Sequence, residues 1–220
     1  MGTLTKYDLS QVPCNVFIET GTGSGGTLRH ACENGHFERL YSVEIHEESA
    51  QKVQAKFANM DNVKIYNATS SDALQDIFTK LKPSDKGFFF LDAHFPGEYA
   101  ADFPGYDHLV MDKLALPLEE ELEMIRNARP ESQDVIVVDD LRLYEQGPFA
   151  GGNLPIGFGG IPEHMRNTDF VYRLFGDRTV VKDYRDEGYL IIVPKGVEFE
   201  LRPLGAWQRL KRNLKKRLNG

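Results

Sequence analysis

Residues 15–34 read NVFIETGTGSGGTLRHACEN, and this stretch decides the fold. Residues 15–20 form a short apolar run that predicts a β-strand, and a helical pattern extends over residues 27–34. Between them lies the glycine-rich segment Gly21–Gly26, which has the spacing GxGxxG. Because this segment follows a strand and opens a helix, its backbone can approach a nucleotide closely. The stretch therefore predicts the first strand, loop and helix of a nucleotide-binding α/β domain.

The remaining chain continues this alternation of strands and helices. Strands are predicted over residues 40–45, 63–66, 87–92 and 134–139, and helices over residues 47–60, 71–81 and 118–126. Two final strands, 179–184 and 188–193, are separated by only three residues. This connection is too short for a parallel crossover, so the two strands should form an antiparallel hairpin. The predicted fold class is α/β, a doubly wound, mostly parallel seven-stranded sheet with a C-terminal antiparallel hairpin.

Length and composition restrict the class of protein. The 220 residues include 26 Lys and Arg against 33 Asp and Glu, and 41% are hydrophobic, which predicts one folded domain. No apolar run reaches the roughly 18 residues of a membrane span, and the start of the chain lacks a signal-peptide pattern. The two cysteines have no metal-ligand spacing, which suits a reducing compartment. We therefore expect a cytoplasmic protein, and its formal charge of −7 argues against nucleic acid as a partner.

Two acidic residues accompany the glycine segment. Glu19 lies two residues before Gly21, and Glu44 lies near the end of the second predicted strand, where a carboxylate can hold both ribose hydroxyls. A carboxylate at the mouth of the first strand would repel a pyrophosphate and attract a positively charged ligand, such as the ammonium and sulfonium of S-adenosylmethionine (SAM). A turn without a ligand and a dinucleotide site are the alternatives.

The segment Glu19-Thr-Gly21-Thr-Gly23-Ser-Gly25 resembles the first motif of the class I, Rossmann-like SAM-dependent methyltransferases, acid-x-Gly-x-Gly-x-Gly. The resemblance extends from residue 16 to about residue 194 and includes the terminal hairpin. It implies that the loop lies against the methionine part of SAM and that Glu44 binds the ribose. Residues 68–72 correspond to the adenine-contacting region, although the family's frequent acid is Thr69 here. The expected cofactor-binding residues are Glu19, Gly21, Thr22, Gly23, Gly25, Glu44, Thr69, Ser70 and Asp92.

Polar residues directly follow the fourth and fifth predicted strands. Asp92 and His94 follow the apolar run of the fourth strand, and Asp139 and Asp140 follow that of the fifth. The carboxyl ends of neighbouring strands converge on one crevice, where three carboxylates would repel one another. A divalent cation bound through oxygen atoms, such as Mg²⁺, would relieve this repulsion. Helix caps or solvated loop acids are the alternative for the aspartates, and a structural histidine is the alternative for His94.

This pattern is similar to the metal-dependent sugar O-methyltransferases of the macrolide and aminocoumarin type. In that family an aspartate after strand 4 and an aspartate pair after strand 5 bind Mg²⁺, which implies a metal site at Asp92, Asp139 and Asp140. The residue two positions after the first aspartate lies near the acceptor hydroxyl, which implies His94 and Asp92 as catalytic residues. The family often has aspartate where this chain has His94. A chelated cation would lower the pKa of a sugar hydroxyl, and a histidine near neutrality could then take its proton.

The predicted function is a SAM-dependent O-methyltransferase that acts on a sugar hydroxyl of a glycan or glycosylated metabolite, with Mg²⁺. A metal-dependent O-methyltransferase of a small phenolic or other metabolite, and a non-catalytic SAM-binding module, are the alternatives. Two long irregular stretches, 95–117 and 147–160, should flank the site. Residues in and near these stretches could bind a carbohydrate ring through polar and aromatic groups, or could pack as ordinary loop residues. These residues are Tyr99, Phe103, Tyr106, His108, Arg142, Tyr144, Phe149 and Phe158.

The ends of the chain raise separate questions. The methyltransferase domain should span residues 1–204, and residues 205–220 form a basic amphipathic tail. In this tail Trp207, Leu210, Leu214 and Leu218 recur at helical spacing beside six cations, so it should either dock on the domain or bind an anionic membrane surface. The first strand begins about 15 residues from Met1, which leaves no room for the N-terminal helices of many small-molecule methyltransferases. We therefore expect either a domain of a longer chain or an open cleft suited to a large glycan.

Overall fold

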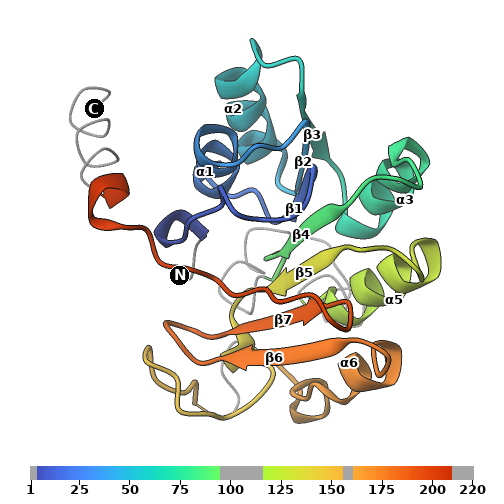
Figure 1. Cartoon of the computed structure of the whole chain (residues 1–220), viewed down its shortest axis with the longest axis vertical. Coiled ribbons are helices and arrows are strands. Elements are labelled where there is room, and N and C mark those ends of the chain that lie inside the picture. Colours follow the sequence, from blue (N-terminus) through green and yellow to red (C-terminus); the bar gives the residue numbers. More distant parts are fainter. Residues whose placement is uncertain (1–3, 95–115, 156–160, 210–220) are drawn as a thin grey trace.

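The chain folds around one mixed β-sheet. The computed structural model describes residues 4–94, 116–155 and 161–209 (Figure 1). Within these residues a seven-stranded sheet has the order β3-β2-β1-β4-β5-β7-β6. The first five strands are parallel, and β7 lies antiparallel between β5 and β6. The predicted fold class, including the terminal antiparallel hairpin, is confirmed.

The elements begin and end close to the predicted residues. The strands are β1 (Val16–Thr20), β2 (Arg39–Glu44), β3 (Val63–Asn67), β4 (Gly87–Leu91), β5 (Val135–Val138), β6 (Thr179–Asp183) and β7 (Tyr189–Val193). The α-helices are α1 (Gly26–Asn34), α2 (Glu47–Phe57), α3 (Ser70–Lys80), α5 (Leu118–Ala128) and α6 (Asp169–Leu174). Short 3₁₀ turns lie at Leu4–Lys6, Leu141–Leu143 and Glu163–Met165. Only α6 was not predicted among these helices, because six residues are too few to show a helical period.

The sheet is covered on both faces, as its apolar strands predict. Figure 1 shows α1 and α2 on one face and α3, α5 and α6 on the other. Successive residues of β1 enter different cores, with Phe17 packed on the side of α1 and Ile18 on the side of α3 and α5. Because both faces of the sheet are buried, polar functional groups are left to the two rims formed by the amino ends and the carboxyl ends of the strands. The carboxyl ends of β1, β2, β4 and β5 lie on the same rim.

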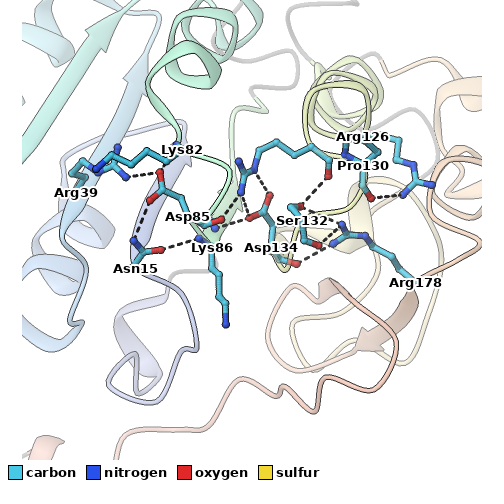
Figure 2. A network of polar contacts seen from close by, with 12 residues as sticks. Asn15, Arg39, Lys82, Asp85, Lys86, Arg126, Pro130, Ser132, Asp134 and Arg178 are labelled. Carbon is cyan, nitrogen blue, oxygen red and sulfur yellow. Dashed lines mark hydrogen bonds and ion pairs between the residues drawn. The ribbon is translucent and has the colours of Figure 1, made fainter.

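A polar network ties together the opposite ends of these strands (Figure 2). Asp134, fully buried just before β5, accepts a hydrogen bond from the first amide of β4, Gly87 N, at 2.6 Å. Its carboxylate also pairs with Arg129 at 2.5 and 2.9 Å. Asp85 joins the network through its carbonyl oxygen, which accepts a hydrogen bond from Arg129 at 2.6 Å, while its carboxylate pairs with Arg39 at 2.6 Å and accepts a hydrogen bond from the Asn15 side chain. The network fixes where the strands begin and lies away from the candidate site.

The segment near residue 204 lies against the domain. Leu204 N donates to Lys6 O at 2.9 Å, and the side chain of Leu204 is buried. Residues 206–209 are helical, but Trp207 is 78% exposed, so its ring is not docked on the domain as one interpretation of the tail expected. Leu210, Leu214 and Leu218 lie outside the described residues. No helix in the described ranges is long and apolar enough to cross a membrane.

Candidate active site

The glycine loop packs directly against the end of β4. Gly21, Gly23 and Gly25 all have positive φ values of 81°, 52° and 78°, which glycine adopts readily. A Cβ atom on Gly21 would lie 2.2 Å from the carbonyl oxygen of Asp92, so this position excludes any side chain. Above Gly23, in contrast, no described atom lies within 4 Å of such a Cβ. The loop is therefore closed toward β4 and open at Gly23, as expected for a backbone cradle beneath a ligand.

Glu44 belongs to this cradle. It is the last residue of β2, and its Oε2 accepts a hydrogen bond from Gly23 N at 2.8 Å. Its Oε1 accepts a second bond from His46 N at 3.0 Å, and the side chain is largely buried. A carboxylate oxygen can accept more than one hydrogen bond, so each retains capacity for a ribose hydroxyl. The structure thus brings together Glu44 and the glycine loop, two predicted parts of the cofactor site.

Glu19 lies beneath the loop and is 1% exposed. Its Oε1 accepts a hydrogen bond from the Ser42 hydroxyl at 2.6 Å, and the Thr22 hydroxyl is hydrogen-bonded to Ser42 in turn. Burial raises the pKa of Glu19 to about 8, against the effect of the Ser42 bond, and the charge of Glu44 adds to the rise. Among the ion pairs of the described residues, none involves Glu19. A nearby ammonium or sulfonium would favour its ionised form, which fits a cationic ligand.

Thr69 and Ser70 lie beside Glu44 but have local partners. Ala68 N donates to Glu44 O at 3.2 Å, which places the turn before α3 next to the end of β2. Thr69 caps α3: its hydroxyl accepts a hydrogen bond from Asp72 N and donates one to the Asp72 carboxylate at 2.8 Å. Ser70 is largely buried as the first residue of the helix. Their predicted adenine contacts therefore stay a prediction, and the Thr69 hydroxyl already serves the helix.

The structure gathers the predicted carboxylates and His94 at the ends of β4 and β5. Asp92 N donates to Thr20 O and Asp139 N donates to Leu91 O, each at 3.0 Å, so the three strands end in step. His94 Nε2 lies 2.7 Å from Asp140 Oδ2 and 3.6 Å from Asp92 Oδ1. Asp139 is 1% exposed, and its Oδ1 accepts a hydrogen bond from Asp140 N at 2.9 Å. His94 and Asp140 are 46 positions apart in the sequence. The hydrogen bond between them joins the ends of β4 and β5 into one polar group.

The ionisable side chains of this group shift one another's pKa values. Burial and then the charge of Asp139 raise the pKa of Asp92 well above its ordinary value. Burial, with the charge of Asp140, raises the pKa of Asp139 to about 7. Burial alone would lower the pKa of His94, but the Asp140 hydrogen bond and the neighbouring carboxylates raise it to about 9. At neutral pH the imidazole is therefore a cation that partly offsets the carboxylates.

Two observations bear on the predicted metal site. Asp139 Oδ2 and Asp140 Oδ1 are buried and have no hydrogen-bond partner among the described residues. Carboxylate oxygens of this kind suit a hard divalent cation, and the mutual repulsion in the group would be relieved by one. The described residues nevertheless hold no set of three or more His, Cys, Asp or Glu side chains already arranged around a common metal position. The donor chemistry fits Mg²⁺, while the side-chain arrangement is that of a His94–Asp140 pair.

A further acid, Glu121, was missed in the sequence. It lies in α5 on the same face as the buried Leu118, Leu122 and Ile125, and it is 1% exposed. Together with His94 and Tyr144 it lines a small pocket. The available signal was an acid at a core position of an amphipathic helix, three residues after Leu118 and four before Ile125.

The aromatic residues proposed for a carbohydrate platform fall into two sets. Tyr144 and Phe149 are buried, and the Phe149 ring packs 5.1 Å from that of Tyr184, so both belong mainly to the core. Arg142 remains partly exposed beside Glu187, with 3.7 Å between their charged groups. The other proposed residues lie outside the described ranges: Tyr99, Phe103, Tyr106, His108 and Phe158.

Comparisons with known proteins support the fold. No protein-family model matches the sequence, and a search of curated proteins finds no significant match. Among solved structures, a protein from Corynebacterium glutamicum has a TM-score of 0.55 at 12% identity, over 90% of this chain and 80% of that protein. A candidate caffeoyl-CoA O-methyltransferase from Staphylococcus aureus has a TM-score of 0.51 at 13% identity, with coverages of 82% and 76%. The O-methyltransferase from Bacillus cereus, solved with S-adenosylhomocysteine, has a TM-score of 0.51 at 18% identity, with coverages of 82% and 74%. The chain therefore has the Rossmann-like fold found in SAM-dependent methyltransferases.

Proposed function

We propose that the chain is a SAM-dependent O-methyltransferase that methylates a sugar hydroxyl of a glycan or glycosylated metabolite. One observation carries the proposal: the glycine loop is pressed against Asp92, so closely that a Cβ atom at position 21 would lie 2.2 Å from the Asp92 carbonyl oxygen. A cofactor held by this loop and by Glu44 would therefore lie beside the group formed by Asp92, His94, Asp139 and Asp140. The sites for the methyl donor and for the acceptor would then both lie at the carboxyl ends of the strands.

Different residues of the chain would contact different parts of SAM. Glu44 would accept hydrogen bonds from the ribose, while Gly23 leaves open space for the nucleoside above the loop. Glu19 would favour the positive charge of SAM from beneath the loop, because the buried carboxyl lacks a cationic partner among the described ion pairs. When bound, SAM supplies an electrophilic methyl group.

The acceptor side rests on the carboxylates and His94. Asp92, Asp139 and Asp140 would hold Mg²⁺, which, when bound, supplies a Lewis acid that lowers the pKa of an acceptor hydroxyl. Asp140 orients the His94 imidazole through the 2.7 Å hydrogen bond. His94 can take a proton from the acceptor once the surrounding negative charge is offset and its pKa falls from about 9 toward neutrality.

The cofactor assignment predicts a thermal shift. At a SAM concentration 100-fold above Kd, linkage adds about 2.7 kcal/mol to the free energy of unfolding, or a rise of about 5–10 °C in Tm for a chain of this size. NAD should produce no shift, since Glu19 at the end of β1 disfavours a pyrophosphate. Glu44→Ala should remove most of the SAM shift, whereas Glu47→Ala, exposed on α2, should preserve it. A curve moved by NAD and unaffected by SAM would contradict the assignment.

A small phenolic acceptor and a non-catalytic SAM-binding role remain the alternatives to a sugar. Methyl transfer from labelled SAM to a panel of methyl glycosides, with catechol in a parallel reaction, separates the three functions. Transfer to a glycoside alone supports the sugar, transfer to catechol alone supports the phenol, and SAM binding without transfer supports the non-catalytic module.

We also propose that the basic tail binds an anionic membrane surface. The support is the exposure of Trp207, 78% accessible, next to a tail with six cations and no acid between residues 209 and 217. The full chain should co-sediment with vesicles that contain phosphatidylserine at moderate salt, and should remain in the supernatant with neutral phosphatidylcholine vesicles. A chain that ends at residue 204 should not co-sediment with either. Equal sedimentation of the two chains would contradict a role for the tail.

A further inference from the structure

The end of β3 carries a side chain that reaches across to the segment holding Glu44. Asn67 is the last residue of β3 and lies opposite Glu44 in the parallel pairing of β2 and β3. Its Nδ2 donates hydrogen bonds to two successive carbonyl oxygens, Glu44 O at 3.0 Å and Ile45 O at 3.1 Å. Because carbonyl oxygens can only accept, the group that faces them must be the amide NH₂, and its two hydrogens serve the two carbonyls.

These bonds complete the contacts around the end of β2. On the side of the glycine loop, Val43 O accepts a hydrogen bond from Gly21 N at 2.9 Å, and Glu44 Oε2 accepts one from Gly23 N at 2.8 Å. On the side of β3, the Asn67 amide holds the two carbonyls that follow. The end of β2 is therefore attached to both of its neighbours, and the position of the Glu44 carboxylate depends on both attachments.

Asn67 lies at the surface, which limits the roles that its side chain can have. The residue is exposed and belongs to the edge strand β3, so it does not fill the core. Hydrogen bonds at the surface compete with water and add little to the free energy of unfolding. Ala68 N also donates to Glu44 O, at 3.2 Å, and this backbone bond would persist without the Asn67 side chain. The effect specific to Asn67 is therefore the orientation of the segment from Glu44 to Ile45.

We propose that Asn67 is a positioning residue for cofactor binding, which fixes the Glu44 carboxylate where the ribose hydroxyls of SAM can donate to it. The inference rests on the proposed function, of which it uses only the assignment of Glu44 to the ribose. It adds that the preference for a ribose with both hydroxyls depends on a side chain of β3 that acts through Glu44. Asn67 should therefore have no effect on the binding of a ligand that lacks these hydroxyls.

The test measures the affinity of the full chain for S-adenosylhomocysteine and for its 2′,3′-dideoxy analogue by calorimetry, with displacement titrations for the weaker ligand. Asn67→Asp keeps the shape of the side chain but turns a carboxylate oxygen toward two carbonyl oxygens. It should weaken S-adenosylhomocysteine by about tenfold to a hundredfold and leave the affinity for the dideoxy analogue near the wild-type value. The matched control is Asn62→Asp, the same substitution at an exposed position just before β3. Both affinities should stay at their wild-type values in this control.

A double-mutant cycle tests whether Asn67 acts through Glu44. Glu44→Ala should weaken S-adenosylhomocysteine by itself, and adding Asn67→Asp should then cause less than about a threefold further loss. Two losses that multiply would show that Asn67 acts independently of Glu44, and the inference would be wrong.

The outcomes separate this inference from the proposed function. An equal loss for both ligands in Asn67→Asp, or no loss for either, would overturn the inference while the proposed function stands. A wild type that binds both ligands equally well would overturn the ribose assignment of Glu44 and the inference with it. A wild type that binds no S-adenosylhomocysteine would overturn the proposed function itself. If Asn67→Asp fails to fold, Asn67→Ala gives the same comparison, with an expected loss of about threefold to tenfold for S-adenosylhomocysteine alone.

Discussion

Replacing His94 by alanine should lower kcat for methyl transfer by about 10²- to 10⁴-fold, which is the usual effect of removing a positioned base. The imidazole is held 2.7 Å from Asp140 at the end of β4, beside the predicted cofactor loop. Its pKa of about 9 in the free protein means that the proton-accepting form increases as the pH rises. The wild-type rate should therefore rise along an acid limb, and this limb should flatten in His94→Ala. The matched control is His36→Ala, which removes an exposed histidine after α1.

Removal of the divalent cation should have the same consequence without loss of SAM binding. Treatment with EDTA should abolish turnover, and Asp139→Asn should do so even with added Mg²⁺, because the variant keeps the shape of a fully buried side chain but removes its charge. SAM affinity, measured by calorimetry, should stay near the wild-type value in both cases. Asp61→Asn, at an exposed position, should retain activity. Full activity after EDTA, together with a wild-type kcat in His94→Ala, would contradict both the metal and the base assignments.

Replacing Asp134 by alanine should reduce the free energy of unfolding by about 3–5 kcal/mol, because it leaves the Arg129 guanidinium buried without its partner. The Arg129 side chain is 8% exposed and that of Asp134 is fully buried, and two hydrogen bonds join them at 2.5 and 2.9 Å. The same change removes the acceptor for Gly87 N at the start of β4. Urea denaturation followed by circular dichroism measures the loss as a lower midpoint with an unchanged slope.

A surface ion pair from the same region provides the control. Asp177 pairs with Arg126 at 3.1 Å, but its side chain is 55% exposed, so Asp177→Ala should cost at most about 1 kcal/mol. Arg129→Lys tests the network where Asp134→Ala yields too little folded protein: it keeps the charge and loses the two-point contact. A loss below about 1 kcal/mol in both Asp134→Ala and Arg129→Lys would show that this network does not hold the strand ends together.

The sequence determined the order of the elements and the edge at which the site lies. Short apolar runs and period-3.6 patterns depend on neighbours a few residues apart, so they identified all seven strands and the longer helices. The glycine spacing likewise predicted a loop between the first strand and helix, and only the structure shows that Gly21, Gly23 and Gly25 have positive φ values there. Because parallel strands end at one edge, the acids that follow them could be assigned to one crevice from the order of the elements alone.

Only the tertiary structure decided how these side chains are paired. His94 and Asp140 are 46 residues apart, and their 2.7 Å contact depends on the register of β4 against β5. The hydrogen bond of the buried Glu19 comes from Ser42 in the neighbouring strand, and the position of Glu121 in the wall of a pocket depends on how α5 packs on the sheet. Local patterns indicate which face of an element is buried, but a pKa or a hydrogen bond depends on distances of a few ångströms between distant segments. Those distances are determined only when the helices and strands pack together.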